Sequence, residues 1–168
     1  KAGEILPLYN NEGHVERVII GHNELEPFFT LGDSYTKLPL GHYQLPASLS
    51  EEAQYQYLLA FGLGAYQFKQ YKTREERAVT FYLPENLDLK VKRALSAHYL
   101  TRDLINEPAN ALNPDNFVTQ IRAELSDLNV NIKEIVGTDL LKQNFPLIYT
   151  VGAASKYHPR LVEIIAEK

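Results

Sequence analysis

The chain has 168 residues, of which 45% are hydrophobic and 23% charged, a composition typical of one folded domain with at most part of a second. Its 17 Lys and Arg residues against 21 Asp and Glu leave a net charge of −4, which disfavours nucleic acid or an anionic membrane as the main partner. Cysteine is absent, which excludes a disulfide framework, a thiolate zinc site and a cysteine nucleophile.

The sequence carries no recognisable membrane or export signal. No apolar run approaches the roughly 20 residues that span a bilayer, and no basic head precedes an apolar stretch at the N-terminus. The chain contains no methionine, so Lys1 is not a translational start. We therefore expect a cytoplasmic protein, present as a processed chain or a fragment.

The first quarter of the chain is rich in short β-prone runs. Residues 4–9 and 15–21 flank the turn sequence of residues 10–13, which predicts a β-hairpin. A short helix is expected over residues 24–31 and a strand over residues 41–45.

A long apolar helix is predicted from an N-cap at Ser48 to about Lys69. Ser48 and Glu51 have the spacing of a capping box at its start. The helix is apolar around most of its circumference, which predicts packing on two sides. Gly62 and Gly64 would destabilise it, so we expect a neighbouring backbone, such as a strand, to approach closely there. The charged stretch that follows leads into a predicted strand over residues 78–83.

A second long helix is predicted from an N-cap at Asp88 to about Asn106, because Pro108 disfavours helical geometry at the preceding residue. The spacing of its apolar residues predicts an inward face of Val91, Ala94, Leu95, His98, Leu104 and Ile105. His98 is therefore interpreted as a core histidine rather than a ligand.

The remaining residues alternate between helices and strands. Asn113 and Pro114 form an N-cap and a first helical position, followed by Phe117, Ile121, Leu125 and Leu128 at helical spacing. Strands are expected over residues 130–136 and 161–166, with helices over 139–142, capped by Thr138, and over 146–154 between them.

This order predicts an α/β fold with parallel strand pairs in both parts of the chain. The prolines and asparagines of residues 107–113 mark a seam between two domains, residues 1–108 and residues 109–168. The second part has few residues for a closed domain with its own core, and it ends directly after its last predicted strand.

Taken by themselves, the residues show no convincing catalytic constellation. Gly62–Leu63–Gly64 is only a partial dinucleotide motif, since Gln67 stands where the third glycine belongs and the run lies within a predicted helix. The adjacent carboxylates at 51–52 and 75–76 are explained by a helix N-terminus and a solvated connection. The five histidines lack metal-ligand spacing; they are His14, His22, His42, His98 and His158.

Two motifs carry a more specific signal. The run TRDLINEPAN over residues 101–110, followed by Asn113 and Pro114, resembles the interdomain segment of the leucyl (cytosol) aminopeptidase family. The run FPLIYTVGAAS over residues 145–155, followed by Pro159 and Arg160, is similar to the next segment of the same family. Ala153 stands where the family usually has arginine, which puts any role of that arginine in doubt here.

The resemblance implies a macro-like N-terminal mixed sheet with helices, joined by a long helix to the truncated beginning of an α/β catalytic domain. Family members are hexameric metallopeptidases that remove N-terminal residues from peptides with two divalent ions, zinc or manganese. The family's metal-binding motifs do not occur in these 168 residues. We therefore assign no catalytic, cofactor-binding or metal-binding residue to the chain, and we expect it to bind no metal and to be inactive alone.

Two alternatives remain open at this stage. The macro-like fold binds ADP-ribose in other proteins, and Gly13 and the Gly32–Asp33 pair are weak candidates for such a nucleotide site. The chain could also be a structural oligomerisation domain. The partners expected from the resemblance are peptide substrates and further copies of the chain.

Overall fold

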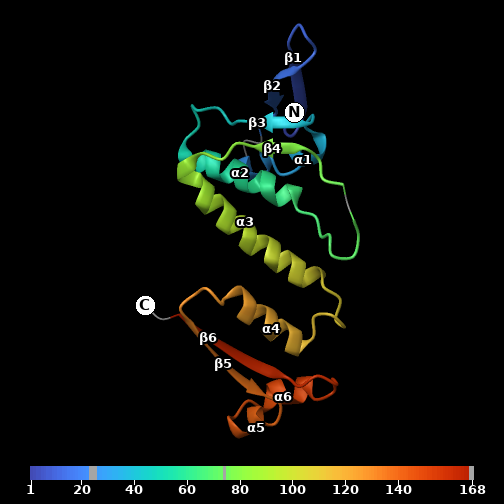
Figure 1. Ribbon diagram of the computed structural model, residues 1–168, viewed down its shortest axis with the longest axis vertical. Helices are drawn as coiled ribbons and strands as arrows, with labels where there is room; N and C mark the ends of the chain where they lie inside the picture. The colour runs from blue at the N-terminus through green and yellow to red at the C-terminus, as the bar shows by residue number, and fades with distance from the viewer. Residues whose placement is uncertain (23–25, 74, 167–168) are drawn as a thin grey trace. The chain divides into compact units, whose positions relative to one another are not determined.

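The computed structural model describes residues 1–22, 26–73 and 75–166. The chain divides into two compact units, Lys1–Asn106 and Glu107–Lys168, called the N-terminal unit and the C-terminal unit below. Both units contain helices and strands (Figure 1), which confirms the α/β class. The described strands pair two by two, as β1–β2, β3–β4 and β5–β6.

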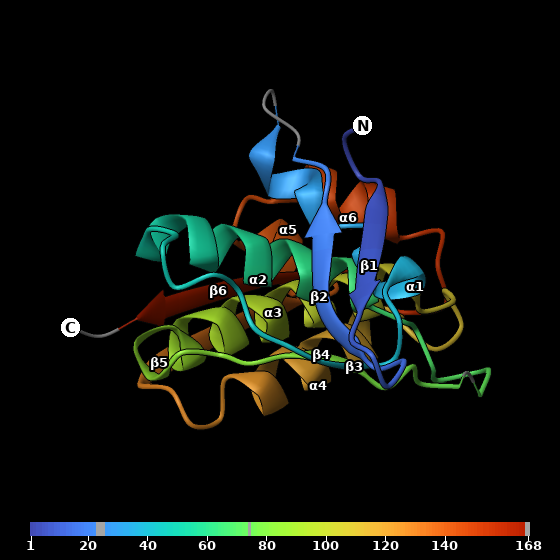
Figure 2. The same ribbon diagram turned by 90° about the horizontal axis from the view of Figure 1, so that it is seen from above.

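The predicted hairpin is present at the start of the chain. Strands β1 (Ile5–Tyr9) and β2 (Val15–Ile20) run antiparallel (Figure 2). In the turn, the Asn10 side-chain oxygen accepts hydrogen bonds from two backbone N–H groups, and Gly13 adopts φ of +82°. The turn therefore forms as predicted, with an asparagine that hydrogen-bonds the nearby backbone and a glycine that adopts positive φ.

A parallel strand pair follows the hairpin. Strands β3 (Gly41–Tyr43) and β4 (Val79–Phe81) are each shorter than predicted. The helix expected over residues 24–31 is reduced to the 3₁₀ turn η1 (Pro27–Thr30), and residues 24 and 25 lie outside the described ranges. Helix α1 (Ser34–Lys37) has no counterpart in the prediction.

Helix α2 (Glu51–Ala65) is shorter than predicted at its end. Its N-cap is Ser50 rather than Ser48, and the Ser50 hydroxyl accepts a hydrogen bond of 3.2 Å from the Ala53 N–H. The helix does not continue to residue 69, because Tyr66 adopts an extended ψ of 135°.

The glycines of α2 allow close packing at two places. A Cβ on Gly64 would lie 1.6 Å from the carbonyl oxygen of Gly32, which confirms a close backbone approach, although from a turn and not from a strand. At Gly62 the neighbour is a side chain, since a Cβ there would lie 2.5 Å from Leu95 Cδ1.

Helix α3 (Glu85–Asn106) begins directly after Pro84, three residues before the predicted N-cap at Asp88. Its buried side is formed by Leu87 and Val91 and continues through the half-buried Leu95 and Tyr99. The prediction that His98 and Ile105 face the core is wrong, because both are exposed. A residue next to Tyr99 on a helix points about 100° away from it, so His98 cannot share the side on which Tyr99 lies.

The core of the N-terminal unit consists of two apolar clusters that both include α2. Phe61 belongs to one cluster and Leu58 to the other, so this helix is packed on two sides, as predicted. The first cluster contains Leu31, Tyr35, Leu38, Phe61 and Val79, and the second contains Leu58, Leu87 and Val91. Helix α3 lies beside α2 (Figure 1).

The C-terminal unit begins with helix α4 (Pro114–Glu124), capped by Asn113 as predicted. Val118 is buried, with Ile121 and Leu125 half-buried on the same side. The other two apolar residues noted at helical spacing, Phe117 and Leu128, have side chains that are 42% and 58% exposed.

The last four elements are β5 (Val130–Val136), α5 (Asp139–Lys142), α6 (Pro146–Gly152) and β6 (Arg160–Ala166). Thr138 occupies the N-cap of α5, but its side chain makes no capping hydrogen bond. Within the described ranges, no helix has both the length and the apolar content needed to cross a bilayer.

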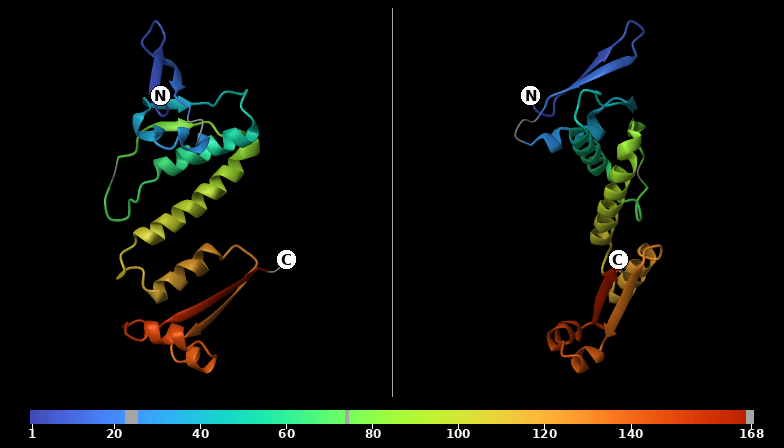
Figure 3. Two further views of the ribbon diagram at one scale, coloured as in Figure 1. Left: turned by 180° about the vertical axis from the view of Figure 1, so that it is seen from behind. Right: turned by 90° about the vertical axis from the view of Figure 1, so that its left-hand side faces the viewer.

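Strands β5 and β6 pair antiparallel, with Val136 opposite Arg160, which corrects the predicted parallel pair in this part of the chain. The two short helices between them lie together at one end of the strand pair (Figure 3). A parallel connection needs a segment that runs back along the full length of the strand. Helices α5 and α6 instead return the chain to the end at which β5 stops.

Candidate functional site

The first sequence motif, at the end of α3, contacts Tyr66. The Tyr66 hydroxyl donates a hydrogen bond of 2.6 Å to Asp103 Oδ1 and accepts one of 3.1 Å from Asn106 Nδ2. The guanidinium of Arg102 lies 4.5 Å from the centre of the Tyr66 ring and donates 2.7 Å to the Leu63 carbonyl. These motif residues therefore join the end of α3 to the last turn of α2, whose carbonyls lack helical partners.

Tyr99 completes this contact between the two helices. Its hydroxyl donates a hydrogen bond to the Gly62 carbonyl, and its ring centre lies 5.3 Å from that of Tyr66. Burial raises the pKa of both phenols above the ordinary value, and the hydrogen bond to Asp103 raises that of Tyr66 further. Both hydroxyls therefore stay protonated at neutral pH and act as hydrogen-bond donors rather than as bases.

A cleft of about 310 Å³ opens beside these tyrosines. We call it the Tyr66 cleft, and it is lined by Tyr35, Ala65, Tyr66, Gln67, Lys69, Glu76, Tyr99 and Asp103. Three aromatic rings and four polar or charged side chains therefore meet at one place. The sequence alone did not indicate this cleft, because its residues come from α1, from α3, and from the end of α2 with the connection to β4.

The connection between α2 and β4 is held by the hydrogen bonds of Arg77 and by one ion pair. At the far end, the Arg77 side chain donates to the backbone carbonyls of Tyr35 and Leu38, at 3.1 and 2.7 Å. The Arg77 N–H also donates to the Tyr35 hydroxyl at 2.9 Å. Between the ends, Lys69 and Glu76 form an ion pair across the connection. That contact holds the pKa of the Glu76 carboxyl below its ordinary value.

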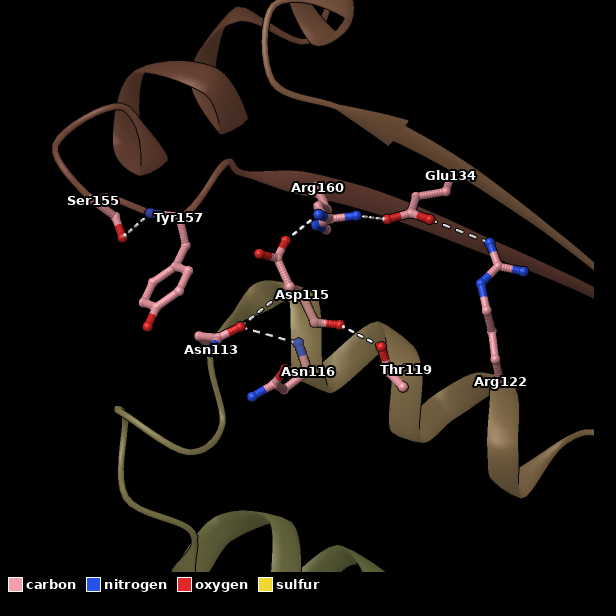
Figure 4. Close-up of polar contacts among 9 residues, drawn as sticks. All are labelled: Asn113, Asp115, Asn116, Thr119, Arg122, Glu134, Ser155, Tyr157 and Arg160. Atoms are coloured by element: carbon pink, nitrogen blue, oxygen red, sulfur yellow. Dashed lines mark hydrogen bonds and ion pairs between the residues drawn. The ribbon is translucent and has the colours of Figure 1, made fainter.

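A separate ionic cluster lies in the C-terminal unit (Figure 4). Arg160, at the start of β6, pairs with Asp115 on α4 and with Glu134 on β5, and Arg122 donates 3.2 Å to Glu134. We call these four residues the Arg160 cluster. The Asn113 side chain, which caps α4, accepts from two backbone N–H groups at 3.0 Å beside it.

The Arg160 cluster is suited to structural support rather than to acid–base or metal chemistry. The hydrogen bond from Arg160 is the largest cause that holds the pKa of the Glu134 carboxyl below its ordinary value. Asp115 and Glu134 are thus both neutralised by guanidinium groups. No group of three or more His, Cys, Asp or Glu side chains in the described ranges could hold a metal ion. The described residues therefore do not fit the two-metal centre that the resemblance implies.

The weak candidates from the sequence do not come together in a site. Gly62 is buried within α2, and Gly64, although exposed, packs against the Gly32 carbonyl; both lie inside a helix rather than in a loop that could hold a phosphate. Gly13 lies in the hairpin turn, and the Gly32 carbonyl packs against Gly64. Two of the histidines contact different neighbours: His42 Nδ1 lies 2.6 Å from Thr80 Oγ1, and His22 Nδ1 lies 3.2 Å from the Tyr57 hydroxyl.

A second cleft, of about 380 Å³, lies where the parallel strands β3 and β4 end. Ligands often bind at such strand ends in α/β proteins. Its lining residues include no glycine and no basic side chain, and they include the Glu85 carboxylate at the start of α3; they are Gln44, Leu45, Ala47, Gln54, Leu58, Tyr82, Pro84 and Glu85. This lining disfavours the nucleotide alternative, because a phosphate would meet a carboxylate.

The second sequence motif is also used in packing. A Cβ on Gly152 would lie 2.3 Å from the Cβ of Pro159, so α6 packs closely on the buried residue that precedes β6. Ala153, where the family usually has arginine, is exposed directly after α6.

Comparisons with known proteins match both units to one family of aminopeptidases. Residues 1–84 match the family model described as the M17 aminopeptidase N-terminal domain. Residues 99–167 match the catalytic domain of the cytosol aminopeptidase family. Among solved structures, the cytosol aminopeptidase from Coxiella burnetii has a TM-score of 0.90 at 33% identity, over 97% of this chain and 36% of that protein.

The chain belongs to the cytosol aminopeptidase (M17) family. A probable cytosol aminopeptidase of Phytoplasma australiense is 31% identical over 129 residues, 68% of this chain and 26% of that protein. One from Sinorhizobium fredii is 28% identical over 121 residues, 63% of this chain and 24% of that protein. The bottromycin maturation enzyme BotP, at 21% identity and a TM-score of 0.77, shares the fold. The chain thus spans about a quarter of the length of these curated relatives.

Proposed function

We propose that these residues are the N-terminal part of an aminopeptidase that removes N-terminal residues, leucine among them, from peptides with two divalent metal ions. The observation that carries the proposal is the likeness to the Coxiella burnetii cytosol aminopeptidase along 97% of the chain. The two family matches, which cover both units in the expected order, support the same proposal.

The described residues contribute support rather than chemistry in this proposal. The motif residues Arg102, Asp103 and Asn106 hold α3 to the end of α2 through Tyr66. Arg160 holds α4, β5 and β6 together. No ligand set for zinc or manganese is found among the described residues, so we assign no step of hydrolysis to them. We infer that the 168-residue chain has no peptidase activity of its own.

The proposal is tested with a chimera in which this chain replaces the matching N-terminal segment of the Coxiella burnetii enzyme. We expect the chimera to hydrolyse leucine p-nitroanilide with added Mn²⁺ or Zn²⁺. N-acetyl-leucine p-nitroanilide serves as the control, and it should not be cleaved because its amine is blocked. A chimera that sediments as a folded assembly yet hydrolyses neither substrate would contradict the proposal.

We further propose that the protein assembles as a homo-oligomer, a hexamer by its family resemblance, and acts in the cytoplasm. The names of the curated relatives, which are cytosol aminopeptidases, support the location. Sedimentation velocity of the chimera tests the assembly, since a monomer under conditions in which the Coxiella burnetii enzyme is oligomeric would contradict it.

A further inference from the structure

We propose that the Tyr66 cleft is a binding site for a free α-amino acid with an apolar or aromatic side chain. In this proposal the ligand ammonium is held by the carboxylates of Asp103 and Glu76, and the ligand carboxylate by the Lys69 ammonium. The site lies entirely within the N-terminal unit. The inference goes beyond the proposed function.

The size and lining of the cleft select a small ligand with an apolar part. Its volume of about 310 Å³ lies at the lower end of the range for ligand pockets. The rings of Tyr35, Tyr66 and Tyr99 form aromatic walls, while their hydroxyls are occupied by hydrogen bonds to protein groups. The rings are therefore available for contact with an aliphatic or aromatic side chain, and also with a cation.

Two side-chain oxygens at the cleft receive no hydrogen bond from the described residues, and they are available to accept one from an ammonium group. Asp103 receives the Tyr66 hydroxyl on Oδ1, and within the described ranges its Oδ2 has no hydrogen-bond partner. Gln67, which also lines the cleft, has a buried Oε1 that lacks a donor among the described residues. Buried acceptors are normally satisfied, so an ammonium placed here would supply missing donors.

The Lys69–Glu76 ion pair matches the two ends of a free amino acid. The pair brings one ammonium and one carboxylate together at the cleft, and its side chains are 43% and 76% exposed. Exposed ion pairs contribute little to stability, so the pair can separate at small cost. An amino acid can then replace each partner, with its carboxylate on Lys69 and its ammonium on Glu76.

The chemical class of the ligand also connects this site with the proposed activity. A free amino acid is what an aminopeptidase releases, so the site would sense the product of the reaction. Only this connection rests on the proposed function. Binding itself is measured without peptide hydrolysis, and failure of one proposal is therefore distinguishable from failure of the other.

The test is titration calorimetry of the purified 168-residue chain with three ligands. Leucine carries both charges, leucinamide lacks the carboxylate, and N-acetyl-leucine lacks the ammonium. For a ligand of this size we expect leucine to bind with a Kd of about 0.1–1 mM, and both analogues to bind at least tenfold more weakly. Equal binding of leucine and either analogue would overturn the inference, as would no binding of leucine.

Two variants locate the site. Asp103→Asn keeps an acceptor for the Tyr66 hydroxyl but removes the charge, and we expect it to weaken leucine binding at least tenfold. Lys69→Gln alters an exposed side chain, and we expect it to reduce leucine binding to the level of leucinamide. Glu85→Gln is the matched control, because it removes a carboxylate from the cleft at the strand ends instead.

Each variant is checked for folding by its circular dichroism spectrum and its melting temperature. If Asp103→Asn does not fold, Lys69→Gln decides the question alone, since its side chain lies on the surface. Unchanged leucine binding in folded Lys69→Gln, or an equal loss in Glu85→Gln, would overturn the assignment of this site.

Discussion

The two units of the chain are stabilised in different ways. In the N-terminal unit, apolar side chains fill two clusters that share α2. In the C-terminal unit, Val118 and Leu140 are buried, but Leu147 and Val151 on α6 are 79% and 85% exposed. There, Asn113 caps α4, and the ion pairs of Arg160 join that helix to both strands. The comparison teaches that apolar burial dominates the first unit, whereas polar contacts carry a larger share in the second.

The largest expected effect is the loss of a core side chain from the N-terminal unit. Leu87→Ala should lower the free energy of unfolding of this unit by about 2–5 kcal/mol, because Leu87 is 1% exposed and packs among buried neighbours. Leu89→Ala makes the same chemical change two residues later, where the side chain is 58% exposed, and should cost less than about 0.5 kcal/mol. Urea unfolding measures both, and equal losses would contradict the described core.

The next effect concerns the Arg160 cluster. Arg160→Met leaves Asp115 without its ion-pair partner and Glu134 with Arg122 alone, and should destabilise the C-terminal unit by about 1–3 kcal/mol. Lys133→Gln is the control, since its pair with Glu163 is about equally exposed on both sides, at 60% and 61%, and should contribute within about 0.5 kcal/mol. Hydrogen exchange of the β5 and β6 amides reports on this unit separately. Similar changes in the two variants would argue against a structural role for Arg160.

A smaller effect is expected at the start of α4. Asn113→Ala removes a side-chain oxygen that accepts from two N–H groups, and should cost about 1 kcal/mol. Thr138 occupies the corresponding position of α5 without a capping hydrogen bond, so Thr138→Ala should cost only a few tenths of a kcal/mol. Hydrogen exchange in α4 and α5 tests the difference.

The Arg160 cluster should also make the stability of the C-terminal unit depend on pH. The pKa of the Glu134 carboxyl is lowered in the folded state, first by the hydrogen bond from Arg160. Stability from this contact is therefore complete above the ordinary value of 4.5 and is lost as the pH falls through the lowered pKa. Glu134→Gln cannot titrate, so the urea midpoint of its C-terminal unit should change less between pH 6 and pH 3. An unchanged slope would show that another group is responsible.

Local chemistry made much of the fold predictable from the sequence. The turn at Asn10–Gly13 and the cap at Asn113 depend on residues a few positions apart, and both were predicted correctly. The features that were predicted wrongly depend on residues that are distant in the sequence. The outward position of His98 follows from the register in which α3 packs on α2, and the direction of β6 follows from where two short helices return the chain.

The candidate sites were less predictable than the fold. The motif residues Arg102, Asp103 and Asn106 were identified by family resemblance, but Tyr66, which they contact, lies about 40 residues earlier in the chain. Leu95, Tyr99 and Asp103 recur every four residues, which indicates one side of a helix. That spacing predicts that the three residues lie on the same side of α3, but it does not predict which side chains from other elements contact them.

Whether these 168 residues serve an aminopeptidase without carrying its chemistry is tested most directly by assaying the purified chain with leucine p-nitroanilide. The assay includes Mn²⁺ or Zn²⁺, with the active chimera as positive control. We predict no hydrolysis above the rate of buffer with metal alone. Hydrolysis that depends on the added metal and stops with EDTA would contradict this account.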